Sequence, residues 1–166
     1  MENDYLVAII MGSGSDYKEH GSKLEAECKD LGLKTEMHVF SAHRTPAKLL
    51  DFIREYNYKN IDIVYITVAG MSDGLSGMVA GATEYPSISC PPKANTGDAY
   101  ADYRSSYNMP PGIAHAFIPD PKNAAIYAAK ILGAKHPELK KKVEEVLLSG
   151  RIKVIKADEE KTYLPK

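Results

Sequence analysis

The chain alternates apolar, strand-like runs with helix-like runs, and this order constrains its fold more than any other feature. Residues 6–11 are apolar without interruption, which is typical of a strand buried on both faces of a parallel sheet. Four more strand-like runs are expected at residues 34–40, 61–68, 86–90 and 113–118, each followed by a helix-like run. The alternation predicts a three-layer α/β/α sandwich with a parallel sheet and right-handed crossovers.

A length of 166 residues predicts a single domain with its own core. We expect a flavodoxin-like or Rossmann-like architecture over residues 1–166, with a core at about 5–133 and a helical tail at 134–166. Within the tail a helix is predicted over residues 137–148. The charged stretch from Gly150 onward is expected to pack on a neighbouring subunit or to fray.

The composition excludes several classes of protein. A net charge of −1 gives no electrostatic case for binding nucleic acid or an anionic membrane. No apolar run approaches the roughly 18 residues of a membrane span, and no signal peptide is expected before the first strand. Cys28 and Cys90 lie far apart and lack the spacing of a zinc site, which favours a reduced, cytoplasmic protein.

The first strand ends in a loop of small residues, Gly12-Ser13-Gly14-Ser15-Asp16, and a helix is expected at residues 16–31. Its exposed amides, two hydroxyls and helix N-terminus together suit an anion. Ser15 or Asp16 can cap the helix. Tyr17 stands where a dinucleotide-binding GxGxxG motif needs its third glycine, and the lysine of a Walker A loop does not follow.

The second strand ends in Ser41-Ala42-His43-Arg44-Thr45-Pro46, directly before a helix expected at residues 47–56. The imidazole of His43 can transfer a proton near neutral pH. The guanidinium of Arg44 beside it can hold a phosphate through two parallel hydrogen bonds, and Ser41 adds a hydroxyl donor. This stretch therefore offers both an acid/base group and an anion site.

The third strand ends in Ala69-Gly70-Met71-Ser72-Asp73-Gly74, before a helix of small residues expected at 75–82. Because the carboxyl ends of parallel strands meet at one edge of the sheet, the three loops predict a ligand site there. Asp16 and Arg44 would suit a ribose phosphate, and His43 would transfer a proton on whatever the sugar carries. No cluster of metal ligands is evident in the pattern.

Two other classes of protein share this architecture. A phospho-receiver domain needs an acidic pair at the end of the first strand, where Met11-Gly12-Ser13 stand. A flavodoxin-like FMN-binding module could use residues 12–16 for phosphate but has no need of His43 and Arg44. The FMN module stays open as an alternative of a different class.

Several stretches carry a resemblance to a known family: Met11-Gly12-Ser13-x-Ser15-Asp16, Ser41-Ala42-His43-Arg44-Thr45-Pro46, Ala69-Gly70, Gly77-Met78, Met109-Pro110-x-Gly112 and Pro121-Lys122-Asn123-Ala124-Ala125. Over residues 6 to about 133 they resemble the PurE family of purine biosynthesis. The resemblance implies an enzyme that interconverts 5-aminoimidazole ribonucleotide and its 4-carboxy derivative. It also implies that no cofactor or metal is used and that the chain assembles as a homo-octamer.

By the same resemblance Ser13, Asp16 and Arg44 bind the ribose phosphate, and His43 transfers the proton at carbon 4 of the imidazole. The loop at Gly70 is expected to close over the base. With the hydroxyls of the three loops included, the residues expected to bind substrate are Ser13, Ser15, Asp16, Ser41, Arg44, Gly70 and Ser72.

The family has a carboxylase branch, which uses CO2, and a mutase branch, which acts on 5-carboxyaminoimidazole ribonucleotide. Mutases typically carry a histidine in the third loop, whereas residues 70–77 contain none. The chain is therefore similar to the phosphoribosylaminoimidazole carboxylases, with the mutase as the alternative. Arg44, Met71 and Asp73 replace the Lys, Arg and Asn usual in that branch. An Asp73 carboxylate pointing into the site would also repel a carboxylated amine.

Overall fold

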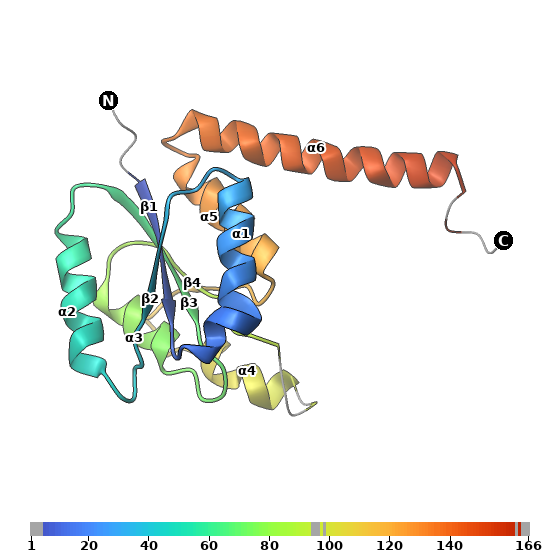
Figure 1. The fold of residues 1–166 in the computed structure, drawn as a ribbon. Coiled ribbons are helices and arrows are strands. Elements are labelled where there is room, and N and C mark those ends of the chain that lie inside the picture. Colours follow the sequence, from blue (N-terminus) through green and yellow to red (C-terminus); the bar gives the residue numbers. More distant parts are fainter. Residues whose placement is uncertain (1–4, 94–96, 98, 162, 164–166) are drawn as a thin grey trace.

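The chain folds around a five-stranded sheet in the computed structural model, which describes residues 5–93, 97, 99–161 and 163. The strand order is β2-β1-β3-β4-β5, and all neighbours are parallel (Figure 1). The strands are β1 Tyr5–Met11, β2 Thr35–Val39, β3 Asp62–Val68, β4 Ser87–Ser89 and β5 Ala116–Phe117. This is the doubly wound order of flavodoxin-like folds, and the predicted fold class is confirmed.

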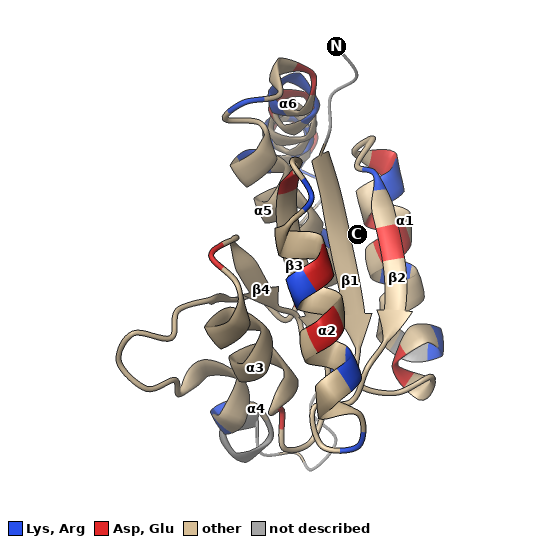
Figure 2. Ribbon diagram, turned by 90° about the vertical axis from the view of Figure 1, so that its left-hand side faces the viewer, with Lys and Arg blue, Asp and Glu red and all other residues tan. Residues whose placement is uncertain are grey.

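Helices cover both faces of the sheet, α1 and α5 on one side and α2 and α3 on the other (Figures 1 and 2). The helical elements are a π-helical turn η1 Tyr17–Gly21, α1 Ser22–Asp30, α2 Pro46–Asn57, α3 Leu75–Ala82, α4 Ala99–Tyr107, α5 Pro121–Leu132 and α6 Pro137–Glu159. Val7 and Ile9 of β1 face the first pair of helices, while Ala8 and Ile10 face the second. Burial on both faces explains why β1 has no charged residue in Figure 2.

The carboxyl ends of β1, β2 and β3 lie side by side. Met11, the last residue of β1, is in register with Val39 of β2 and with Val68 of β3. The pairing continues past the strand ends, because Gly12 N donates to Val68 O and Phe40 N donates to Met11 O, each at 2.9 Å. The loops that follow these strands are therefore held together at one edge of the sheet.

The structure differs from the sequence-based expectation at the start of the first helix. The helix opens with the π-helical turn η1, and Asp16 makes no side-chain cap. A Cβ atom on Gly21 would lie 2.8 Å from Sδ of Met11, so the absent side chain lets this turn pack closely on the end of β1.

The last helix and the last strand also differ from the expectation. Helix α6 continues through Gly150 to Glu159, where a helix ending at residue 148 was predicted. One glycine costs a helix only about 1 kcal/mol, and the helix-forming residues after it extend α6. Strand β5 is limited to Ala116–Phe117, which pair with Ile88 and Ser89 of β4, where a strand over residues 113–118 is expected from the sequence.

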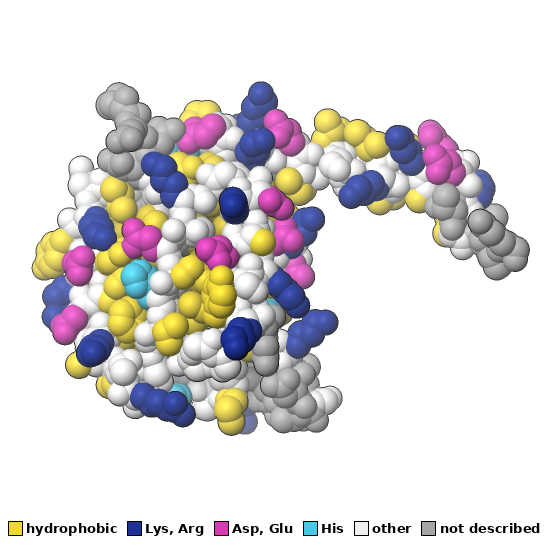
Figure 3. Space-filling view, in the orientation of Figure 1, with side chains coloured by type: hydrophobic (Ala, Val, Ile, Leu, Met, Phe, Trp, Pro, Cys, Tyr) yellow, Lys and Arg dark blue, Asp and Glu magenta, His cyan; other side chains and the backbone are white. Residues whose placement is uncertain are grey.

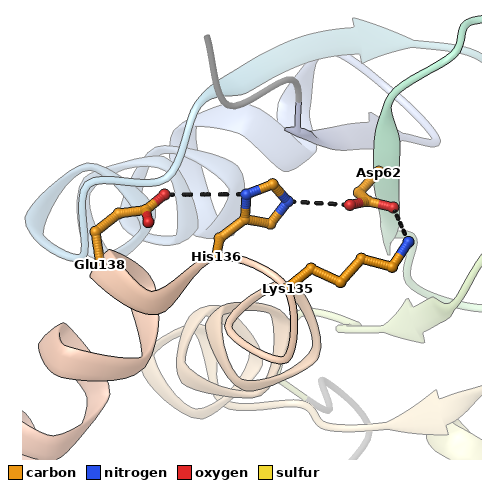
Figure 4. A network of polar contacts seen from close by, with 4 residues as sticks. All are labelled: Asp62, Lys135, His136 and Glu138. Atoms are coloured by element: carbon orange, nitrogen blue, oxygen red, sulfur yellow. Dashed lines mark hydrogen bonds and ion pairs between the residues drawn. The ribbon is translucent and has the colours of Figure 1, made fainter. Parts of the chain in front are cut away.

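A polar network anchors the start of α6 at the end of the sheet opposite the three loops (Figure 4). Asp62, at the beginning of β3, accepts hydrogen bonds from Lys135 Nζ at 2.6 Å and His136 Nε2 at 3.0 Å. Glu138 lies 4.0 Å from the other ring nitrogen of His136. Hydrogen bonding from Lys135 lowers the pKa of Asp62 below its usual value. Beyond Val146 the helix projects away from the domain (Figure 1).

Candidate functional site

A cavity of about 810 Å³ lies at the carboxyl ends of β1, β2 and β3. All eight residues predicted from the sequence to form the site line this cavity. They are Ser13, Ser15, Asp16, Ser41, His43, Arg44, Gly70 and Ser72. The structure thus brings together side chains from three loops that are up to about 60 residues apart in the sequence (Ser13 to Ser72).

The first loop is closed by hydrogen bonds within itself. Asp16 accepts from Ser13 N at 2.8 Å and from Ser13 Oγ at 3.1 Å, both through Oδ2. Ser13 Oγ and Ser15 Oγ lie 2.6 Å apart. A Cβ atom on Gly12 would lie 3.2 Å from Cβ of Ala69, so the absent side chain lets the first loop approach the third. The carboxylate expected to cap a helix instead shapes the loop.

The second loop is a compact turn that presents two side chains to the cavity. Ser41 O accepts from Thr45 N at 2.9 Å, and Ser41 Oγ accepts from Arg44 N at 3.2 Å. Pro46 follows as the first residue of α2, a position that suits proline and lies one residue before the helix start expected from the sequence. The side chains of His43 and Arg44 are exposed and line the cavity. Among the described residues none hydrogen-bonds to the His43 imidazole, which is exposed to the cavity.

The third loop has one exposed half and one buried half. Met71 and Ser72 are exposed, and Met71 is held in the left-handed region with φ 58°. Asp73 is only 3% exposed, and its carboxylate is hydrogen-bonded away from the cavity. The condition under which Asp73 would repel a carboxylated ligand is therefore not met, because its carboxylate does not face the cavity.

Gly74 brings the third loop against the proposed acid/base residue. A Cβ atom placed on Gly74 would lie 3.1 Å from Nε2 of His43 and 3.6 Å from its Cε1. The backbone at Gly74 has φ −81°, which any residue can adopt. A side chain at residue 74 would thus press on the imidazole, and the constraint at this position comes from that contact and not from the backbone conformation.

Sequence reasoning missed a fourth wall of the cavity, formed by Pro91, Pro92, Lys93 and Tyr103. The first three follow β4, so the rule that ligands bind at strand ends could have found them. A Cβ atom on Gly70 would lie 3.3 Å from Cγ of Pro92, which places this wall directly against the third loop. Tyr103 comes from α4, for which the sequence offers no comparable signal.

The charges at the cavity favour an anionic ligand with a hydroxyl-bearing part. Arg44 and Lys93 supply positive charge, and Asp16 is the one acidic residue among the described lining residues. In the part of the chain that the structure describes, no group of three or more His, Cys, Asp or Glu side chains could hold a metal ion. The chemistry offered by the lining residues is anion binding together with proton transfer at His43.

Two other histidines are built into the framework. His20 is buried with its Nε2 3.3 Å from Sγ of Cys90, and burial lowers its pKa. The same burial raises the pKa of the Cys90 thiol. His136 belongs to the network around Asp62. Neither imidazole lines the cavity, which leaves His43 as its one histidine among the described residues.

The family model described as AIR carboxylase matches residues 6–150. The chain belongs to the AIR carboxylase family. A solved structure of this family, PurE from Treponema denticola, superimposes with a TM-score of 0.90 at 35% identity, over 94% of this chain and 98% of that one. The resemblance stated from the sequence motifs is thus confirmed.

Among the curated relatives, two are named phosphoribosylaminoimidazole carboxylase. The one from Archaeoglobus fulgidus is 40% identical over 92% of this chain and 82% of the relative. The one from Treponema denticola is 38% identical over 92% of this chain and 95% of the relative. A bifunctional carboxylase and succinocarboxamide synthetase from Drosophila melanogaster is 39% identical over 96% of this chain, which spans only 37% of that relative. The enzyme class predicted from the sequence agrees with these names.

Within residues 5–93, 97, 99–161 and 163, no helix combines the length and the apolar character needed to cross a membrane.

Proposed function

We propose that this AIR carboxylase family member catalyses the reversible carboxylation of 5-aminoimidazole ribonucleotide by CO2 in purine biosynthesis. The observation that carries the proposal is the placing of His43, which lies between an anion-binding loop and a third loop without a second histidine. The family motifs supply the identity of the substrate.

The first two loops would bind the ribose phosphate. Ser13 and Ser15 present hydroxyls next to the N-terminus of a helical segment, where exposed amides favour an anion. Arg44 can add a charge-assisted, bidentate hydrogen bond to the phosphate. Asp16 uses Oδ2 within the loop, and its Oδ1 makes no hydrogen bond to the described residues, so this oxygen can accept from a ribose hydroxyl.

The proton transfer would be made by His43 at carbon 4 of the aminoimidazole. Electrons from the amino-substituted ring form a bond from carbon 4 to the carbon of CO2, and one C=O pair moves to oxygen to give the carboxylate. His43 then takes the proton from carbon 4, and the C–H electron pair restores the aromatic ring. In the reverse direction protonated His43 returns the proton to carbon 4, and CO2 leaves.

The test is to compare turnover and substrate affinity in His43→Ala. Loss of general acid–base catalysis typically costs roughly 10²- to 10⁴-fold in rate. We expect a fall of that size with nearly unchanged affinity for 5-aminoimidazole ribonucleotide, measured by calorimetry without CO2. A rate close to that of the wild type would remove His43 from the mechanism.

The proposal includes a homo-oligomer, by resemblance an octamer, built from single-domain chains with a core at 5–133 and a tail at 134–166. The projecting part of α6 supports association, because Leu148, Ile152 and Ile155 recur at helical spacing and are 43–56% exposed. Figure 3 shows apolar side chains along this projection. Such a surface on a free helix favours a partner. A stable monomer in sedimentation at micromolar concentration would contradict the proposal.

A cytoplasmic location is also part of the proposal. Cys28 and Cys90 are both buried and unpaired, which suits a reducing compartment.

A further inference from the structure

The carboxylate of Asp73 lies at the centre of a buried hydrogen-bond cluster. It accepts from the backbone amides of Leu75 and Ser76, each at 3.0 Å, through Oδ1. Through Oδ2 it accepts from the hydroxyls of Ser76 at 2.7 Å, Ser106 at 2.8 Å and Ser89 at 3.2 Å. These five bonds join the third loop to the first turn of α3, to β4 and to α4. A buried charge is tolerated when it is fully hydrogen-bonded in this way.

Helix α4 also holds the backbone of the third loop directly. The hydroxyl of Ser105 accepts from Asp73 N at 2.8 Å and lies 3.4 Å from Met71 O, to which it can donate. Helix α4 is itself held by the segment before β5, because Nε2 of His115 lies 2.5 Å from Ser106 O. The loop is therefore attached to α4 by both side chain and backbone at Asp73, while Met71 and Ser72 remain exposed.

The residue after Asp73 is the one that borders the catalytic imidazole. Gly74 packs so closely that a Cβ atom on it would lie 3.1 Å from Nε2 of His43. Because consecutive Cα atoms are fixed about 3.8 Å apart, anchoring Asp73 also anchors Gly74. The hydrogen bonds of Asp73, which lie on the side of the third loop away from the cavity, thus fix the position of Gly74 beside His43.

We propose that Asp73 is a positioning residue, whose hydrogen bonds to Ser89 and Ser106 hold Gly74 against His43 and so fix the imidazole for proton transfer. This inference rests on the proposed function, since it concerns the proton transfer assigned to His43. Asp73 does not touch the substrate, because its carboxylate points away from the cavity. Its removal should therefore act on the rate and not on substrate binding.

Strand β4 offers a matched pair of variants for the test. Ser89→Ala removes a hydroxyl that donates to Asp73. Ser87→Ala removes a buried hydroxyl two residues earlier on the same strand, which has no hydrogen-bond partner among the described residues. We expect kcat to fall roughly three- to tenfold in Ser89→Ala, with the Kd for 5-aminoimidazole ribonucleotide within about twofold of the wild type, because small displacements of a catalytic group are costly. In Ser87→Ala we expect both values to be unchanged.

A double-mutant cycle tests whether Asp73 acts through Gly74. Gly74→Ala pushes on the imidazole directly, and Asp73→Asn loosens the anchor while its carbonyl oxygen can still accept from the amides of α3. If both substitutions act on the position of His43, the loss of kcat in the double variant should be smaller than the product of the losses in the two single variants. Independent effects would overturn the proposal. So would a lowered Tm with unchanged kcat in both Asp73→Asn and Ser89→Ala, which is the result expected of a purely structural carboxylate.

The wild-type protein separates this inference from the proposed function. If the wild type does not carboxylate 5-aminoimidazole ribonucleotide, the proposed function fails and takes the inference with it. If the wild type is active and Asp73→Asn and Ser89→Ala turn over at the wild-type rate, only the positioning role of Asp73 fails.

Discussion

Substituting Gly74 by alanine should slow catalysis without unfolding the protein. The new Cβ would lie 3.1 Å from His43 Nε2 and 3.7 Å from Cβ of Ala42. An ordinary contact begins near 3.4 Å, so the imidazole must retreat by a few tenths of an ångström. The backbone can accept alanine, because Gly74 has φ −81° and ψ −12°.

The size of the effect follows from that displacement. A misplacement of about 1 Å can cost roughly a hundredfold in rate, so a shift of a few tenths corresponds to roughly a four- to tenfold loss in kcat. That loss equals about 0.8 to 1.4 kcal/mol of transition-state free energy. Affinity for 5-aminoimidazole ribonucleotide should change less, because the phosphate-binding groups lie on the other two loops.

The assay is steady-state carboxylation at saturating CO2, together with calorimetric titration of the substrate. Gly150→Ala is the matched control, since a Cβ atom there meets nothing within 4 Å and the residue lies on the projecting part of α6. Wild-type kcat in Gly74→Ala would refute the argument that His43 must sit where the structure has it.

Two further predictions concern the phosphate site and the anchor of α6. Arg44→Ala should weaken binding of 5-aminoimidazole ribonucleotide by roughly ten- to a hundredfold, the usual worth of a hydrogen bond to a charged group. Arg54→Ala, which removes an exposed arginine from α2, should not weaken binding. Equal affinities of Arg44→Ala and the wild type in calorimetry would place the phosphate elsewhere. Hydrogen bonding from Lys135 lowers the pKa of Asp62 below 3.8. The ionised Asp62 carboxylate therefore stabilises the folded protein fully above pH 3.8, and this stabilisation is lost as the pH falls through the lowered pKa. Denaturant unfolding should therefore find Asp62→Asn less stable than the wild type at about pH 6, with the difference vanishing at low pH; a constant difference would contradict the ion pair.

The strands and the strand-end loops could be predicted because they depend on local signals. The unbroken apolar run of β1 and the glycine, serine and histidine residues that follow β1 and β2 carry the pattern within a few residues. Once the strands are known to pair in parallel, the loops after them are known to meet at one edge of the sheet. This is why the eight predicted site residues line a single cavity.

Features that depend on distant partners could not be predicted in the same way. The direction of the Asp73 side chain is decided by Ser89 and Ser106, which lie 16 and 33 residues away. Tyr103 reaches the cavity from α4, whose place is set by tertiary packing. Helix α6 extends past residue 148, where the sequence predicts its end, because a single glycine costs a helix only about 1 kcal/mol and the charged residues after Gly150 continue it.

The central claim is that the substrate pair is 5-aminoimidazole ribonucleotide and CO2, and the most direct test is to supply each carboxyl donor separately. With 5-aminoimidazole ribonucleotide and bicarbonate-derived CO2, we predict rapid formation of the 4-carboxy product. With 5-carboxyaminoimidazole ribonucleotide and CO2 continuously scavenged, we predict little product, because the third loop lacks the histidine typical of mutases. Rapid formation of the 4-carboxy product under scavenging would contradict the account and identify the enzyme as a mutase.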